Sequence, residues 1–157
     1  LLKRLGLRCS DTVLELGSGP GYFSHTIAKF LSKGRLVLAD IQQEMLVKAK
    51  KRLQKRAVSN VDFHLCEANR LDFQSETFDV IFLVTVLGEI ENQSIYIQEF
   101  YRITKPNGVV SISECWGDPD RMTQDEIVQL FESQGFKLDR TFSSFGAITL
   151  NFRKSAS

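Results

Sequence analysis

The sequence predicts an α/β fold in which helices cover both faces of a mostly parallel, seven-stranded sheet, a three-layer sandwich. Short continuous apolar runs, such as residues 13–16 and 78–84, are typical of buried parallel strands. Segments with apolar residues at helical spacing, such as residues 43–57, separate these runs. A glycine-rich turn directly follows the first run, which is where open α/β sheets bind ligands. With 157 residues, we expect one domain spanning residues 1–157.

The composition excludes several classes of protein. Hydrophobic residues make up 43% and charged residues 25% of the chain, and the formal net charge is +1, so there is no strong nucleic-acid signal. No apolar run approaches the roughly 20 residues of a membrane helix, and no secretory signal is visible. The three cysteines form neither a disulfide framework nor a C-x-x-C pair, so we expect no metal site and a cytoplasmic location.

The first strand and its turn carry the main ligand signal. After a short helix ended by Gly6, residues 13–16 form the strand, and three alternate glycines follow in the segment Glu15-Leu16-Gly17-Ser18-Gly19-Pro20-Gly21-Tyr22. A dinucleotide loop would place a glycine at position 22, where Tyr22 stands, and a phosphate loop would end in lysine and a hydroxyl residue. A carboxylate before the loop repels phosphate and suits a cationic ligand.

This acidic-x-G-x-G-x-G pattern resembles motif I of the class I S-adenosylmethionine-dependent methyltransferases. The resemblance implies S-adenosylmethionine as cofactor and sheet order 3-2-1-4-5-7-6 with the last strand antiparallel. It also implies that the N-terminal lid of the family is largely absent here. The residues that it places at the cofactor in this turn are Glu15, Gly17, Ser18, Gly19, Gly21 and Tyr22. We expect Gly19 to serve ligand approach, with Gly17 and Gly21 absorbing the special backbone angles.

The next helix and strand lead to an acid. Residues 23, 27, 30 and 31 share one helical face, and Gly34 is expected to end that helix. Residues 35–40 form the second strand. Its last residue, Asp40, stands about 20 residues after the glycine turn, where a ribose-binding carboxylate belongs, with Ile41 beside it. The alternative is a turn or N-cap residue. We expect Asp40→Ala to fold almost normally.

A helix over residues 43–57 buries Met45, Leu46, Ala49 and Leu53. Its other face carries six cations, Lys48, Lys50, Lys51, Arg52, Lys55 and Arg56. Such a run can grip nucleic acid, but no aromatic residues interrupt it for base stacking, so a solvated helix face is the preferred interpretation.

The third and fourth strands add further candidates by resemblance. Residues 61–66 precede Glu67-Ala68-Asn69-Arg70-Leu71-Asp72-Phe73, which is similar to the family's adenine-binding segment and implies contacts from Glu67 and the Ala68 amide. After the fourth strand, the carbonyl of Leu83 or Val84 would meet the cofactor's ammonium. Glu89 replaces a histidine common in relatives and is a candidate general base, with a solvated residue at a helix start as the alternative.

The last third completes the pattern. We expect a helix over residues 93–104 that buries residues 97, 100, 101 and 103. A Lys-Pro turn at residues 105–108 and a strand over residues 109–114 follow. Trp116 would wall the substrate pocket, and Thr123 with Glu126 forms a capping box for a helix ended by Gly135. Two extended runs in residues 136–153 form a hairpin.

The resemblance implies methyl transfer to a small-molecule acceptor, nearest to enzymes of the quinone-biosynthesis type. Two alternatives stay open. One is a non-catalytic, cofactor-binding partner subunit of another protein. The other is a thiol-dependent arsenite methyltransferase, because Cys66 and Cys115 both follow strands.

Overall fold

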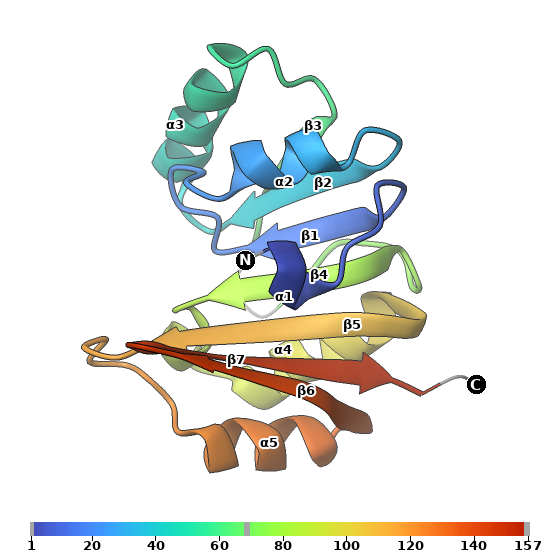
Figure 1. Cartoon of the computed structure of the whole chain (residues 1–157), viewed down its shortest axis with the longest axis vertical. Coiled ribbons are helices and arrows are strands. Elements are labelled where there is room, and N and C mark those ends of the chain that lie inside the picture. Colours follow the sequence, from blue (N-terminus) through green and yellow to red (C-terminus); the bar gives the residue numbers. More distant parts are fainter. Residues whose placement is uncertain (1, 68–69, 156–157) are drawn as a thin grey trace.

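The computed structural model describes residues 2–67 and 70–155 and contains one seven-stranded sheet flanked by helices. Strand order is β3-β2-β1-β4-β5-β7-β6, with β7 antiparallel to both β5 and β6 (Figure 1). The predicted fold class, sheet order and antiparallel last strand are therefore confirmed. The strands are β1 (Thr12–Leu16), β2 (Arg35–Asp40), β3 (Val61–Leu65), β4 (Phe78–Val84), β5 (Thr104–Cys115), β6 (Phe136–Ser144) and β7 (Ala147–Lys154).

The helices form two layers, one on each face of the sheet (Figure 1). On one face lie α1 (Leu2–Leu5), α2 (Ser24–Phe30) and α3 (Gln43–Gln54), and on the other lie α4 (Gln93–Ile103) and α5 (Gln124–Glu132). A 3₁₀ turn, η1 (Leu87–Glu89), follows β4. The arrows of β1 and β4 point to the same edge of the sheet, so their carboxyl ends meet there (Figure 1). Among the described residues, no helix combines the length and the apolar character needed to cross a membrane.

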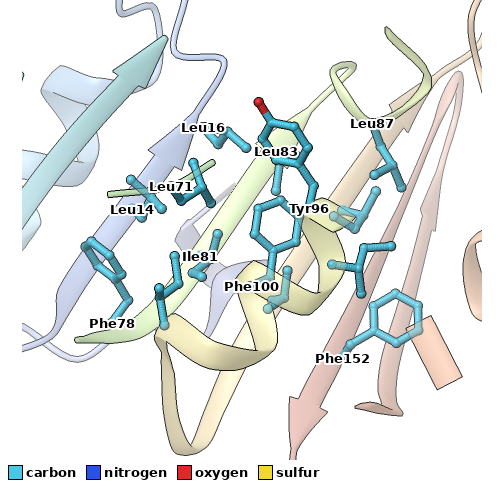
Figure 2. Packing of buried hydrophobic residues seen from close by; sticks show 14 of the residues in the cluster. Leu14, Leu16, Leu71, Phe78, Ile81, Leu83, Leu87, Tyr96, Phe100 and Phe152 are labelled. Atoms are coloured by element: carbon cyan, nitrogen blue, oxygen red, sulfur yellow. The ribbon is translucent and has the colours of Figure 1, made fainter. Parts of the chain in front are cut away.

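Each face of the sheet has its own hydrophobic core. Leu14, Ile81 and Val110 point toward α4 and α5, whereas Val13, Val80 and Val109 point toward α2 and α3. The alternation follows the period of two along a strand. Figure 2 shows the larger cluster, in which Phe100, Leu83 and Leu87 surround the region where β4 ends.

Local sequence signals account for several boundaries. The capping box at Thr123 is present, with both the Thr123 side chain and the Glu126 side chain accepting backbone N–H groups. Helix α5 ends at Glu132 rather than at Gly135, which lies with a φ of +91° in the turn that follows, and Gly6 follows α1 with a φ of +63°. Gly146, with a φ of +83°, lies in the turn of the predicted hairpin.

Three local predictions are wrong. Helix α2 ends at Phe30, not at Gly34, because Gly34 lies against the backbone of Asp11, where a Cβ would sit 2.2 Å from the Asp11 carbonyl oxygen. Of the four residues predicted to share the buried face, Ile27 and Leu31 are buried, whereas Phe23 and Phe30 are exposed and Ser24 and Ala28 are buried in their place. Residues 105–108 belong to β5 and do not form a turn before it. The pairing of β5 with β4 is irregular there, because Phe78 pairs with Thr104 and Val80 pairs with Val109.

Helix α4 faces the core slightly differently from the prediction. Tyr96 is buried with Ile97, Phe100 and Ile103, whereas Tyr101 is only partly buried. Met45 in α3 is likewise partly buried, because it borders the cavity described below.

Candidate functional site

A cavity of about 550 Å³ lies at the edge of the sheet where β1, β2 and β4 end. A volume of this size suits a small ligand. The carboxyl end of each of these parallel strands contributes to its wall, and so do the loops that lead from β1 to α2 and from β2 to α3. The predicted site residues that line it are Gly17, Gly19, Asp40, Ile41 and Glu89.

The glycine turn closes one wall of the cavity. Gly17, Gly19 and Gly21 have φ values of +67°, +51° and +74°, in the left-handed region that side chains disfavour. The expectation that the two outer glycines relieve Gly19 of this conformation is therefore wrong. A Cβ on Gly19 would meet no protein atom within 4 Å, whereas one on Gly17 would lie 2.4 Å from the Val86 side chain. Gly19 thus leaves free space beside its backbone, and Gly17 permits close packing of the turn on the β4–η1 segment.

Asp40 ties the glycine turn to the start of α3. Its Oδ2 accepts a hydrogen bond from the Gly19 N–H, and its Oδ1 accepts one from the Gln42 N–H, both at 2.9 Å. The side chain is nearly buried. Gln42, rather than Asp40, is the N-cap position of α3. Because both oxygens hold backbone donors, the structure favours a loss of stability in Asp40→Ala over the nearly normal folding expected from the sequence.

Glu15 does not face the cavity. Its Oε2 accepts a hydrogen bond of 2.6 Å from the hydroxyl of Ser24, the first residue of α2, and both side chains are buried. Burial raises the pKa of Glu15 to about 8, although the Ser24 hydrogen bond opposes this. The carboxyl group is therefore mostly neutral at pH 7. The side chain is directed at α2, and a contact of its charge with a cationic ligand stays a prediction.

The remaining predicted cofactor residues stand behind or beside the cavity wall. Leu83 is buried in the core and the neighbouring Val84 lines the cavity, while Tyr22 is 69% exposed, with the Arg52 guanidinium 4.5 Å from its ring centre. Ser18 is buried, and within the described residues its hydroxyl oxygen has no hydrogen-bond partner. Glu67 is exposed after β3, and Ala68 lies outside the described residues.

Sequence reasoning missed part of the wall beyond β4. Thr85, Ile90, Glu91 and Tyr96 line the cavity together with Glu89. Thr85 has a φ of +53°, an uncommon conformation for a β-branched residue, and its N–H donates to the Ser113 carbonyl at 2.9 Å. The helical spacing of the buried positions in α4 includes Tyr96, so this spacing could have identified Tyr96 as a residue that faces inward. Trp116 does not line the cavity and is 64% exposed, so its predicted wall role is not supported.

A second acid is buried near this wall. Glu114, next to the end of β5, is 1% exposed, and within the described part of the chain its Oε1 has no hydrogen-bond partner. Burial raises its pKa to about 7, and the nearby carboxylates of Asp118 and Glu89 add to the rise. The segment that contains Asp118 and Asp120 covers η1, since a Cβ on Gly88 would overlap the Asp120 carbonyl oxygen.

The comparisons with known proteins agree with this geometry. The family described as "Methyltransferase domain" matches residues 8–146. The ubiquinone/menaquinone biosynthesis C-methyltransferase UbiE of Hydrogenovibrio crunogenus is 30% identical over 135 residues, which cover 85% of this chain and 52% of that protein. An uncharacterized methyltransferase of Schizosaccharomyces pombe is 30% identical over 112 residues, 68% of this chain and 40% of that protein. The chain thus spans about half the length of these relatives.

Solved structures show the same fold. A SAM-dependent methyltransferase from Aquifex aeolicus superimposes with a TM-score of 0.91 at 24% identity, covering 97% of this chain and 86% of that one. The [4+2]-cyclase SpnF superimposes with a TM-score of 0.88 at 17% identity, covering 99% of this chain and 78% of that one. Because the second is described as a cyclase, likeness of fold does not by itself determine the reaction.

Proposed function

The chain belongs to the family of S-adenosylmethionine-dependent methyltransferase domains, and we propose that it transfers a methyl group to a small-molecule acceptor bound beside Glu89. One observation carries the proposal. A single cavity at the carboxyl ends of β1, β2 and β4 brings the glycine turn, Asp40 and the η1 segment together. The relative from H. crunogenus, described as a quinone-biosynthesis C-methyltransferase, makes a small-molecule acceptor the preferred class.

The residues present fit the cofactor. The free space beside Gly19 lets a ligand approach the backbone of the turn. Each Asp40 oxygen already accepts one backbone N–H, and a carboxylate has about four acceptor positions, so ribose hydroxyls can be held in addition. Ile41 would cover the adenine-ribose side of the cavity. Bound there, S-adenosylmethionine supplies an electrophilic methyl group.

Other predicted cofactor residues enter the proposal through their backbone or through the turn that they shape. Val84 lines the cavity, and the Leu83 or Val84 carbonyl at the end of β4 would accept from the cofactor's ammonium. Ser18 and Gly21 fix the turn, since the Gly21 N–H donates to the Ser18 carbonyl at 3.0 Å. Glu67 and Ala68 remain proposed adenine contacts.

The wall beyond β4 would receive the acceptor. Val86, Ile90 and Tyr96 give it an apolar surface, and Glu89 lies at its exposed side. When an acceptor C–H, N–H or O–H group is methylated, one proton is released. In this proposal the Glu89 carboxylate, which lines the cavity, takes this proton as a general base. Alignment of the reacting groups and exclusion of water can supply up to about 7–11 kcal/mol of the rate enhancement.

The chemistry of the cysteines does not favour arsenite methylation. Burial, with a smaller effect from Asp40, raises the pKa of Cys66 to about 11, which suppresses the thiolate that would bind arsenic. The described residues contain no group of side chains suited to hold a metal ion. The role of a non-catalytic partner subunit requires the same cofactor cavity, and only an activity measurement separates it from an enzyme. We also propose a cytoplasmic location.

Binding and turnover of the chain test the proposal. Calorimetry should detect S-adenosylhomocysteine at micromolar concentrations and show no binding of NAD. A panel of phenolic, quinol and amine acceptors should then yield methylated product. Glu89→Gln should lower kcat while leaving S-adenosylhomocysteine affinity within about twofold. Binding of NAD in preference would exclude the cofactor assignment, and cofactor binding without any methylated product would favour the partner-subunit role.

A further inference from the structure

Charge is distributed very unevenly along this nearly neutral chain. Residues 16–39 and 45–61 contain nine lysine and arginine residues and no aspartate or glutamate. The formal net charge of the whole chain is nevertheless only +1, so the other segments are acidic overall. The two basic segments contain all of α2 and the part of α3 that follows its one acid, Glu44, and the two helices cover the same face of the sheet (Figure 1). The fold therefore gathers the cations on one side of the molecule.

Specific contacts join the two helices into one surface. The Arg52 guanidinium lies 4.5 Å from the ring centre of Tyr22, and Arg56 Nη1 lies 3.1 Å from His25 Nδ1. At the start of α2, a Cβ on Gly21 would be 3.1 Å from Ala49 Cβ, so the helices pack closely. Sequence reasoning found no aromatic residues within the basic run of α3. The structure places Tyr22, two residues before α2, next to it.

The outer face of α3 is left free for a partner. Lys48, Lys51 and Lys55 follow one another at helical spacing and are exposed, and none has an ion-pair partner among the described residues. Arg35, by contrast, is paired with Asp62. Unpaired cations that share one face repel each other, and an external polyanion relieves this repulsion.

Exposed apolar side chains accompany these cations. Of the nine exposed large hydrophobic residues in the described part of the chain, five lie between positions 22 and 47. They are Tyr22, Phe23, Phe30, Ile41 and Val47, of which Tyr22 is 69% and Ile41 64% exposed. A mixture of lysine, arginine and exposed apolar groups on neighbouring segments is typical of proteins that lie on the surface of an anionic membrane.

We propose that the outer surface of α2 and α3 (residues 22–33 and 43–56) docks on an anionic lipid bilayer, its lysines among the headgroups and its apolar side chains at the acyl boundary. The aliphatic side chains of this surface favour a bilayer over a polynucleotide as the partner. Val47, like Ile41 at the edge of this surface, has no ring to stack on a base, whereas both gain by leaving water for the lipid interface. Ile41 also lines the cavity, so docking would bring the cavity entrance beside the membrane.

Vesicle co-sedimentation tests the proposal without any measurement of activity. The full chain should bind vesicles of phosphatidylglycerol and phosphatidylcholine, and not vesicles of phosphatidylcholine alone, and added salt should weaken the binding. The double variant Lys51→Gln/Lys55→Gln should bind the anionic vesicles at least about tenfold more weakly. Val47→Ser should weaken binding less, and in a manner nearly independent of salt.

A matched control removes the same charge elsewhere. Lys137→Gln/Arg140→Gln changes two exposed cations of β6, at the far edge of the sheet from α2 and α3, and should bind the vesicles like the parent. Thermal melting should show that every variant is folded. Equal losses in both double variants, or no preference for anionic vesicles, would overturn the proposal. It would also be overturned if the α3 variant lost binding to single-stranded RNA but kept its binding to vesicles.

Discussion

The two halves of the cavity wall are built in different ways. On the β1–β2 side, a short sequence motif and one carboxylate fix the wall, since Asp40 accepts the N–H groups of Gly19 and Gln42. On the β4–β5 side, Thr85 in a left-handed conformation, η1 and Tyr96 of α4 form the wall, and the segment after β5 packs against η1 from farther along the chain. We infer that the first half is built to hold a constant ligand and that the second is free to vary with the acceptor.

Each half also contains one buried acid whose pKa is raised, and this sharpens the comparison. Glu15 lies under the glycine turn with Ser24 as its partner, while Glu114 lies near η1 with one oxygen that lacks a hydrogen bond in the described structure. Burial raises the pKa of Glu15 to about 8 and that of Glu114 to about 7. The free energy of unfolding therefore depends on pH through both groups, and the pH range of this dependence is wider for Glu15 than for Glu114.

The largest expected effect is this dependence on pH. From pH 4.5 to about 8, folded Glu15 keeps a proton that the unfolded chain has released, so the free energy of unfolding falls as pH rises through this range. We expect a loss of about 3 kcal/mol or more between pH 5 and 8, measured by urea denaturation. Glu15→Gln, which keeps an acceptor for Ser24, should flatten the profile, and Glu114→Gln should flatten it less. A Glu15→Gln profile as steep as that of the parent would contradict this assignment.

The second effect probes the contact between the two halves. Gly17→Ala places a Cβ against Val86 and forces alanine into a left-handed conformation, so it should lower the free energy of unfolding by about 2–3 kcal/mol. Val86→Ala shortens the side chain that the new Cβ would overlap. In a protein that already carries Val86→Ala, Gly17→Ala should therefore lower the free energy of unfolding by less than it does in the parent. Strict additivity of the two changes would show that the halves do not press on each other there.

The third effect concerns the carboxylate that organises the β1–β2 side. Asp40→Ala leaves the Gly19 and Gln42 N–H groups without their acceptor, so unfolding should become easier by about 2 kcal/mol. It should also abolish most of the melting-temperature rise caused by S-adenosylhomocysteine. Asp40→Asn, which retains one acceptor oxygen, should lose less stability. Full cofactor affinity in a folded Asp40→Ala protein would limit Asp40 to its turn role.

The smallest expected effect on stability belongs to Gly19. Because a Cβ there meets no protein atom but φ is +51°, Gly19→Ala should lower the free energy of unfolding by only about 1 kcal/mol. It should nevertheless reduce the stabilisation by S-adenosylhomocysteine, since the Cβ occupies space beside the turn. An undiminished melting-temperature rise would show that the ligand does not approach this position.

The sequence by itself determined the order of elements and the position of the ligand edge. Strands β2 and β4 have the predicted bounds because each is an apolar run that the sheet buries. The capping box of α5 and the glycines in the turn after α5 and in the final hairpin act through neighbouring residues, so a local pattern reveals them. Gly17, Gly19 and Asp40 at the cavity were found for the same reason.

Only the tertiary structure decided what depends on residues far apart in the chain. Gly34 is required by the Asp11 backbone, and Tyr96 reaches the cavity by its place in α4. The protonation of Glu15 depends on how completely the surrounding elements exclude water, a property of the packed molecule rather than of any short segment. The cations of α3 gain aromatic neighbours only where α2 packs against them. Spacing along the chain specifies local geometry, whereas burial and charge environment exist only once the layers are assembled.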